Sequence, residues 1–155
     1  MAQIIDGKLI SKQIKDEVKE KVSAYKAQGI EISLAVVLVG NDPASTVYVG
    51  NKKKACEYTG INSVSYELPE DTTEAELLEL IDKLNNDDKI NGILVQLPLP
   101  KHIDEDKVIK AISPLKDVDG FHPMSVGALS IGQPGFVSCT PAGISELIKR
   151  SGADI

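Results

Sequence analysis

Two stretches of the chain are almost continuously apolar, the pattern of strands buried on both faces of a parallel sheet. They cover residues 32–39 and 90–97, and Pro98 stops the second because proline has no amide hydrogen to donate. Residues 61–68 instead alternate between apolar and polar positions, which predicts a less buried strand. The hydrophobic pattern therefore predicts buried strands on either side of a more exposed one along the chain.

The segments between the strands repeat apolar side chains at the spacing of an amphipathic helix. A first helix precedes Gly29, a glycine suited to a helix C-terminus, and a second carries Tyr48 and ends at Gly60. A third opens with Thr73 and Glu76 in the spacing of a capping box. The apolar stripe of the first helix is Ile10, Ile14, Val18, Val22 and Tyr25, and that of the third is Leu77, Leu80, Ile81 and Leu84.

The last third of the chain has a weaker pattern. A short helix is predicted over residues 104–112, and residues 114–139, rich in glycine and proline, are predicted to be irregular. Thr140 and Pro141 are typical of the N-cap and first residue of a final helix. The apolar residues of that helix are Ile144, Leu147 and Ile148.

The alternation of helices and strands predicts an α/β protein with a mostly parallel sheet and helices on both faces, a three-layer α/β/α arrangement. A chain of 155 residues is long enough for one such domain. After Gly152 the chain continues only as Ala153-Asp154-Ile155, which resembles the first residues of another strand or of a linker. We therefore expect these residues to be the N-terminal part of a longer protein, the alternative being a frayed natural C-terminus.

Charge and cysteine content narrow the function classes. A net charge of −6 and a pI near 4.9 argue against nucleic acid or an anionic membrane as partner, because both require clustered basic surface. Cys56 and Cys139 lack the spacing of a zinc site or a redox motif. No signal peptide or apolar membrane span is evident. The sequence therefore predicts a soluble cytoplasmic protein without a metal site.

The most informative segment runs from the end of the first buried strand into the second helix, residues 39–52. Tyr48 and Lys52 are four residues apart, so they share one helix face. This helix follows the carboxyl end of a strand, where open α/β sheets bind their ligands. A ring to stack on and an amine to move protons suit a flat, nitrogen-containing substrate. The alternative is a surface lysine above a packed tyrosine.

Two further segments are expected at the same end of the sheet. Gln96 is the one polar residue in the apolar run 93–97, and a buried amide needs hydrogen-bond partners from protein, water or ligand. It is equally well explained as a glutamine that caps a turn. Asp117 and Asp119 precede Gly120, so one of the two carboxylates can face the crevice and accept N–H groups from a ligand.

Other chemistries have weaker support. The two aspartates lack the further oxygen ligands of a calcium loop and are also explained by a simple turn. His122, beside a proline, is expected to be structural rather than a proton carrier. Ser45 has no G-x-S-x-G context that would make it a nucleophile. No G-x-G-x-x-G fingerprint occurs, so a dinucleotide site within this chain is not expected.

Together these segments resemble the bifunctional methylenetetrahydrofolate dehydrogenase/methenyltetrahydrofolate cyclohydrolase family, over the whole chain. The similar segments are Ile5-Asp6-Gly7-Lys8, Val39-Gly40, Pro43-Ala44-Ser45, Tyr48-Val49-x-x-Lys52, Gly92-Ile93-Leu94-Val95-Gln96-Leu97-Pro98-Leu99-Pro100, Lys116-Asp117-Val118-Asp119-Gly120-Phe121 and Cys139-Thr140-Pro141-Ala142-Gly143. The resemblance implies oxidation of methylenetetrahydrofolate to methenyltetrahydrofolate with NADP, or NAD in some members. It also implies hydrolysis of methenyltetrahydrofolate to formyltetrahydrofolate.

The resemblance also implies roles for individual residues. Lys52 matches the family's catalytic lysine, with Gln96 as its partner. Tyr48 matches the ring that stacks on the aminobenzoyl part of the folate, and Asp119 matches the carboxylate that holds the pterin. All three of Lys52, Gln96 and Asp119 are thus candidate catalytic residues. The folate-binding set implied by the matching segments is Ser45, Tyr48, Val95, Gln96, Leu97 and Asp119.

Family members are longer than this chain. The resemblance implies a nucleotide-binding domain beyond Ile155 that binds NADP, no cofactor-binding residue within residues 1–155, and a homodimeric parent protein. Other readings are the substrate domain of an amino-acid or shikimate-type dehydrogenase, and a non-enzymatic ligand-binding module. The Tyr48–Lys52 helix together with the segment 95–98 favours folate chemistry over both.

Overall fold

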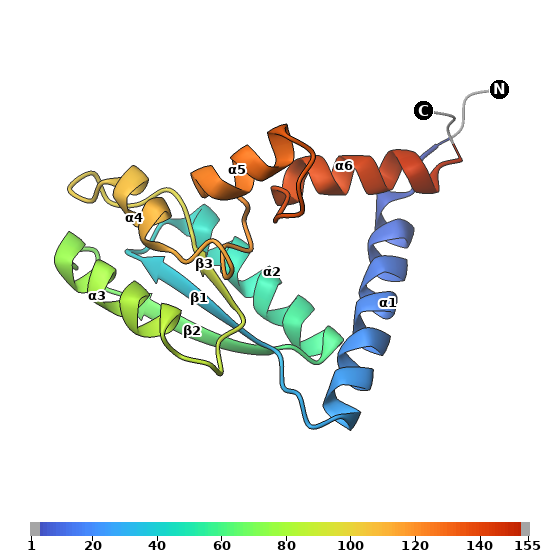
Figure 1. Cartoon of the computed structure of the whole chain (residues 1–155), viewed down its shortest axis with the longest axis horizontal. Coiled ribbons are helices and arrows are strands. Elements are labelled where there is room, and N and C mark those ends of the chain that lie inside the picture. The colour runs from blue at the N-terminus through green and yellow to red at the C-terminus, as the bar shows by residue number, and fades with distance from the viewer. Residues whose placement is uncertain (1–3, 153–155) are drawn as a thin grey trace.

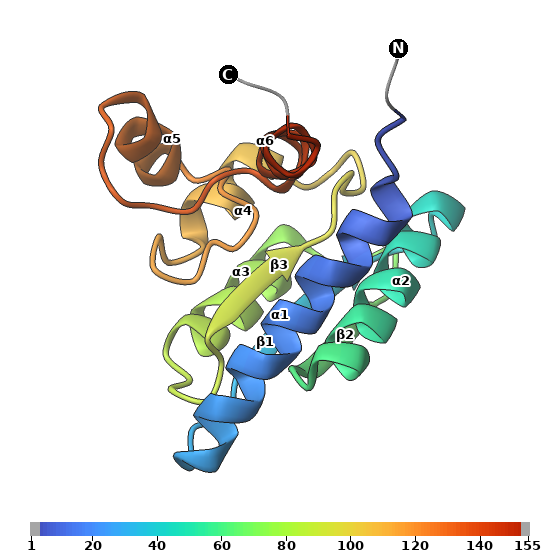
Figure 2. The ribbon, with the colours of Figure 1, turned by 90° about the vertical axis from the view of Figure 1, so that its right-hand side faces the viewer.

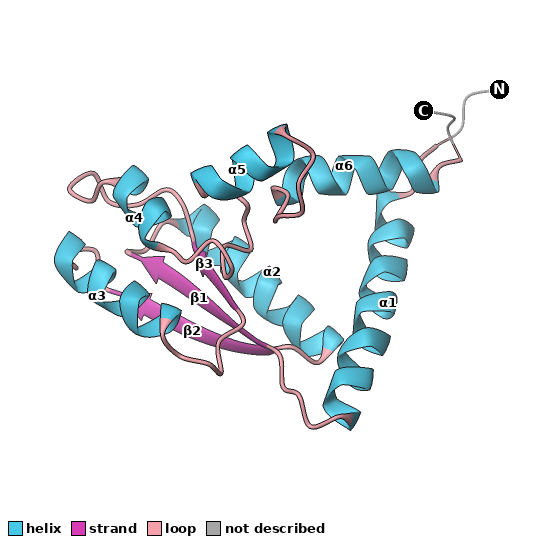
Figure 3. Ribbon diagram, viewed as in Figure 1, coloured by secondary structure: helices cyan, strands magenta, loops and turns pink. Residues whose placement is uncertain are grey.

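The computed structural model describes residues 4–152 as one arrangement of helices around a small sheet (Figures 1 and 3). The expectation that residues 153–155 begin a further strand lies outside the described residues. The helices are α1 (Gly7–Ala27), α2 (Pro43–Thr59), α3 (Glu74–Asn85), α4 (Glu105–Ala111), α5 (Pro123–Ser130) and α6 (Cys139–Arg150). The strands are β1 (Ser33–Val39), β2 (Asn62–Leu68) and β3 (Gly92–Val95).

The sheet has the order β2-β1-β3, and both pairings are parallel. Strand β1 lies in the centre, so Val37 is paired with Tyr66 on one side and Val95 on the other. All carboxyl ends therefore point to the same edge of the sheet. The predicted α/β class with a parallel sheet is confirmed.

Alternate residues of the sheet pack against helices on opposite faces, which makes three layers. One core joins Val37 and Ile93 to Leu77 of α3 and Val108 of α4. The other joins Val36, Leu38 and Leu94 to Val49 of α2. Figure 2 shows α2 and α3 on opposite sides of β3. Because both faces of β1 are covered, its nearly continuous apolar sequence is explained.

Helix ends follow the predicted local signals. Thr73 accepts a hydrogen bond from the Glu76 amide while the Glu76 carboxylate accepts one from the Thr73 amide, so the capping box is present at the start of α3. Gly60 ends α2 with φ of 83°, a backbone angle that glycine adopts without steric cost. Gly29 also has positive φ, one residue after Gln28, the residue that caps α1.

Strand β3 is shorter than the predicted 90–97. The Ile90 amide donates to the Asp87 carbonyl in a turn. The Asn91 amide donates to the Ser33 carbonyl, but the Ser33 amide is taken up by the Asn91 side-chain oxygen, so the regular strand begins only at Gly92. Past Val95, the Gln96 amide still bonds to β1, but no further ladder forms. Ile90 is apolar because it is buried at the end of the core, not because it belongs to the strand.

The predicted irregular stretch 114–139 contains helix α5, which was missed. His122 is its N-cap and Pro123 is its first residue. A proline at this position favours the start of a helix, but the glycines in this stretch led to the prediction of irregular structure. The final helix starts earlier than predicted, because Ser138 rather than Thr140 is the N-cap and Pro141 lies inside the first turn. A proline is tolerated there because the first turn's amides have no helical partner.

Helix α1 contacts the C-terminal end of α2 (Figure 1), and only Ile10 and Val22 of its predicted stripe are fully buried. It is also tied to α6, because the Arg150 guanidinium donates two hydrogen bonds to the Glu17 carboxylate, at 2.6 and 2.9 Å. Tyr25 at its C-terminal end remains exposed. None of the helices within residues 4–152 is long and apolar enough to cross a bilayer.

Leu77→Ala tests the core between α3 and the sheet. Leu77 is fully buried, so we expect the substitution to lower the free energy of unfolding by about 2–5 kcal/mol through lost burial and a residual cavity. Urea denaturation followed by circular dichroism measures the change. Leu9→Ala is the matched control, since that side chain is 54% exposed and its loss should cost less than about 0.5 kcal/mol. Equal effects would contradict this assignment of the core.

Candidate functional site at the carboxyl edge of the sheet

Helix α2 starts directly after the loop that follows β1, and this places its first turns at the carboxyl edge of the sheet. Asp42 is its N-cap, and the Asp42 carboxylate accepts the Ser45 amide at 2.7 Å. This backbone hydrogen bond, chiefly, holds the pKa of Asp42 below its ordinary value. Pro43 presets the first helical turn. The helix carrying Tyr48 and Lys52 is therefore fixed at its start.

The central contact of the site joins α2 to the end of β3. The Lys52 Nζ donates a hydrogen bond to Gln96 Oε1 at 2.8 Å. The Gln96 Nε2 donates to the Leu97 carbonyl at 2.7 Å, which orients the amide so that its oxygen faces the lysine. The structure thus brings together two residues that are 44 positions apart in the sequence. Lys52 is half-buried, whereas its neighbours Lys53 and Lys54 are exposed.

Asp119 supplies a carboxylate to the same region. It lies in a turn that the Gly120 amide closes by donating to the Asp117 carbonyl at 3.3 Å. Burial raises the pKa of Asp119, the positive charge of Lys52 opposes that shift, and the nearby Asp117 carboxylate adds to it. Asp119 also lines a narrow pocket with Leu97 and Phe121. A half-buried carboxylate near an amine is suited to accept N–H groups from a ligand.

The Asp119 turn is backed by a segment far along the chain. Gly120 has φ of 68°, and a Cβ there would lie 2.8 Å from the Ser138 nitrogen and 2.9 Å from the Val137 carbonyl carbon. Only glycine permits this close approach. The approach brings the Cys139 Sγ to 4.0 Å from Asp119 Oδ1 and 3.8 Å from the Val118 carbonyl oxygen. Burial, and next the charge of Asp119, raise the pKa of the Cys139 thiol.

The remaining candidate residues surround this group at different depths. Ser45 and Val95 are buried, the former in the first turn of α2 and the latter in β3. Leu97 is half-buried just past the strand. Tyr48 is 62% exposed one helical turn before Lys52, so its ring is open to a partner from outside the chain. Ser45 and Val95 therefore form the wall of the site, and they are less accessible to a ligand than Tyr48.

His122 has the structural place expected from the sequence. Its Nδ1 accepts the Met124 amide at 3.0 Å, which caps α5. The Asp117 carboxylate accepts hydrogen bonds from the His122 amide and the Ser125 hydroxyl. Within residues 4–152, no group of three or more His, Cys, Asp or Glu side chains could hold a metal ion. Sequence reasoning missed the roles of Asp117 and Cys139, because both depend on contacts with the unpredicted segment 122–139.

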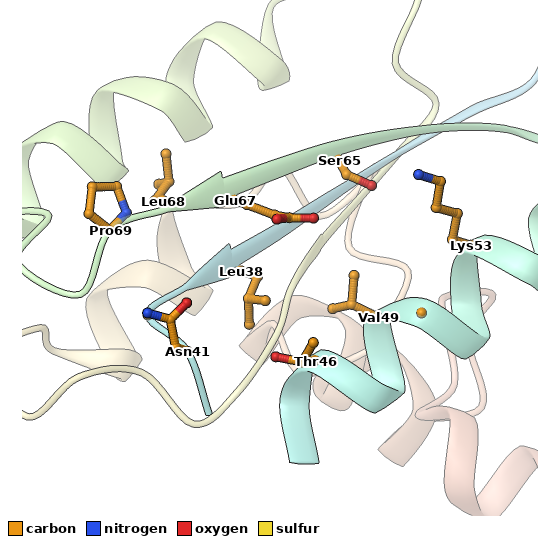
Figure 4. Close-up of a pocket in the computed structure, with 11 residues that line it drawn as sticks. Leu38, Asn41, Thr46, Val49, Lys53, Ser65, Glu67, Leu68 and Pro69 are labelled. Carbon is orange, nitrogen blue, oxygen red and sulfur yellow. The ribbon is translucent and has the colours of Figure 1, made fainter. Parts of the chain in front are cut away.

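A larger pocket of about 450 Å³ lies between α2 and the strands β1 and β2 (Figure 4). Leu38, Val49 and Lys53 line it together with Glu67 of β2. It does not include Lys52, so it is separate from the candidate site.

Comparison with known proteins gives the family. The model of the tetrahydrofolate dehydrogenase/cyclohydrolase catalytic domain matches residues 5–119, most of the chain. The chain belongs to this family. The matched residues include the three segments that meet at the carboxyl edge of the sheet, up to Asp119.

Individual relatives agree with this assignment. The chain is 71% identical to the bifunctional protein FolD of Agathobacter rectalis over 155 residues, which is 100% of this chain and 56% of that protein. Among solved structures, it is similar to the FolD methylenetetrahydrofolate dehydrogenase/cyclohydrolase of Campylobacter jejuni, with TM-score 0.95, 52% identity, and 97% and 54% of the two chains covered. The Trypanosoma brucei enzyme, complexed with NADP cofactor and inhibitor, gives TM-score 0.94 and 35% identity over 99% of this chain and 53% of that one.

The chain spans about half the length of the curated relatives it matches. The similarity therefore covers the fold and the site described above, while the other half of each relative has no counterpart among these residues.

Asp119→Asn tests the electrostatics of the site through stability. Because burial raises the pKa of Asp119 in the fold, its ionised form is disfavoured there relative to the unfolded chain. The contribution of this group to stability is thus present at low pH and is lost as pH rises through the folded pKa. We expect Asp119→Asn, which stays neutral, to be more stable than the parent at about pH 7 and to lose that advantage at about pH 3. Thermal unfolding at both pH values measures it.

Glu76→Gln is a comparison variant, for which we expect the opposite change in stability at neutral pH. Hydrogen bonds from Thr73 hold the pKa of Glu76 below its ordinary value, so this substitution should reduce stability at neutral pH and not in acid. A destabilised Asp119→Asn at neutral pH would show that the Lys52 charge, rather than burial, dominates at Asp119.

Proposed function

We propose that this chain is the folate-binding catalytic part of an enzyme that oxidises methylenetetrahydrofolate to methenyltetrahydrofolate with NADP and hydrolyses methenyltetrahydrofolate to formyltetrahydrofolate. The observation that carries the proposal is the Lys52–Gln96 hydrogen bond at the sheet edge, with Asp119 close to the same amine. The names of the relatives, bifunctional FolD and methylenetetrahydrofolate dehydrogenase/cyclohydrolase, support it. The free thiols Cys56 and Cys139 support the cytoplasmic setting expected from the sequence.

Each residue of the site has a proposed part in holding the folate. The Asp119 carboxylate accepts N–H groups of the pterin ring, and the exposed Tyr48 ring stacks on the aminobenzoyl group. Ser45, Val95 and Leu97 form the wall around them. This arrangement places the one-carbon unit of the folate next to the Lys52 amine.

Hydrolysis is the step that these residues can perform. Water forms a bond to the methenyl carbon, one carbon–nitrogen bond breaks, and a proton is released overall. In our proposal Lys52 carries the proton between the attacking water and the folate nitrogen, and Gln96 holds the flexible amine in place. A positioned proton carrier of this kind typically contributes about a hundred- to ten-thousand-fold in rate.

The helices that follow the strands do not offer their N-termini to the pyrophosphate of NADP. The helices that follow β1, β2 and β3 are the places where a pyrophosphate could sit, yet the carboxylates of Asp42, Glu76 and Asp104 already cap them. A second anion at these N-termini would be repelled. We therefore assign hydride acceptance to NADP bound outside residues 4–152.

Folate binding is the first test. Addition of 5-formyltetrahydrofolate, an air-stable reduced folate, should raise the melting temperature of the chain, since a ligand that binds only the folded state stabilises it. Free amino acids and shikimate should leave the melting temperature unchanged. Stabilisation by an amino acid or shikimate and not by the folate would favour the other dehydrogenase class instead.

Lys52→Met tests the proton chemistry in the full-length gene product. The substitution keeps an unbranched stem and removes the amine, so we expect methenyltetrahydrofolate hydrolysis to fall by about a hundred- to ten-thousand-fold with the fold intact. The rate is followed by loss of the methenyl absorbance. Lys54→Met is the control, because Lys54 is exposed and lies about 200° further round α2 at roughly 100° per residue.

A loss of less than about tenfold at Lys52 would reject its assignment as the proton carrier. A larger loss at Lys53 or Lys54 than at Lys52 would show that a different face of α2 bears the chemistry.

A further inference from the structure

Asp117 carries a buried carboxylate two residues before Asp119. The side chain is 2% exposed, and its Oδ2 accepts the His122 amide at 2.9 Å and the Ser125 hydroxyl at 2.8 Å. Ser125 is itself buried on α5, at 4% exposure. A buried carboxylate is costly unless hydrogen bonds satisfy it, so these two contacts fix where α5 starts.

The backbone of Asp117 is attached to the sheet. Asp117 forms a parallel bridge with Ile93 of β3, and the Ile93 amide donates to the Lys116 carbonyl at 2.8 Å. The turn that contains Asp119 begins at the Asp117 carbonyl. Asp117 therefore connects three things: the sheet through its backbone, α5 through its side chain, and the Asp119 turn that lies between them.

We infer that Asp117 is a positioning residue of the folate site, because its carboxylate ties α5 to the edge of β3 and thereby fixes the turn that presents Asp119 to the substrate. Ser125 is the matching half of this link. The inference rests on the proposed function, which gives the Asp119 carboxylate its ligand. Asp117 itself does not touch the folate; it acts through Asp119.

The charge of Asp117 provides a second way to test its link to Asp119, through the pKa of the Asp119 carboxyl group. Asp119 is faced by Lys52 from α2, by Asp117 from the segment beside β3, and by the Cys139 thiol from the start of α6. Burial and the Asp117 carboxylate raise the pKa of Asp119, and Lys52 lowers it. Removing the Asp117 charge should lower the pKa of Asp119. Folate binding needs the Asp119 carboxylate to accept N–H groups, so it should then persist to lower pH.

The test is calorimetric titration of 5-formyltetrahydrofolate into the full-length gene product and its variants. Ser125→Ala removes one hydrogen bond to a carboxylate, and we expect folate affinity to fall about tenfold or more. Asp117→Ala removes both bonds and should cost at least as much. Asp117→Asn keeps an acceptor oxygen, so it should recover part of the affinity and move the acid limb of folate binding to lower pH.

Ser130→Ala is the matched control. Its hydroxyl donates to the Val126 carbonyl on the same helix α5 and is exposed, so affinity should stay within about twofold of the parent. Circular dichroism melting verifies that each variant folds. If Asp117→Ala does not fold, Asp117→Asn and Ser125→Ala decide the question.

The outcomes separate the two proposals. Absence of folate binding by the parent protein rejects the proposed function itself. Folate binding by the parent with Ser125→Ala within about twofold of Ser130→Ala overturns the positioning role and leaves the function standing. An acid limb that Asp117→Asn does not move also overturns it, because a role limited to folding would leave the titration of Asp119 unchanged.

Discussion

The parallel pairing of β1 with β3 is the contact on which the candidate site depends. It sends both strands to the same edge, so the loop after β1 starts α2 beside the point where β3 ends. Lys52 can then reach Gln96, although the two residues are 44 positions apart in the sequence. A slip of this pairing by one residue would turn every side chain of β3 to the opposite face and separate the two groups.

Much of the fold follows from local sequence signals, because each has a direct physical cause. The apolar run of β1 reflects burial on both faces, and Thr73 with Glu76 satisfies the first amides of α3 wherever that helix packs. Errors appear where tertiary contacts decide. Ile90 is apolar as part of the core yet outside β3, and α5 is held by the hydrogen bond that its Ser125 hydroxyl donates to the buried Asp117 carboxylate.

Some features of the candidate site could likewise be predicted from local sequence, whereas others depend on tertiary contacts. The shared face of Tyr48 and Lys52 is a matter of helical period, so it could be predicted. The Lys52–Gln96 contact required the strand order, which the sequence pattern leaves open, and the family resemblance supplied it. The Asp117 link had no local signal, because an aspartate before Gly120 is equally well explained by a turn. The functional roles of these residues stay predictions until the variants are measured.

The close approach at Gly120 bears on where the working unit ends. The family match stops at residue 119, yet the backbone of residues 136–138 presses against Gly120 and forms the rear wall behind Asp119. A protein shortened at residue 119 would keep every matched residue and lose that wall. The portion of the chain that the family model matches is therefore smaller than the portion that shapes the candidate site, and a transplant of this site into another scaffold has to carry residues through at least Cys139.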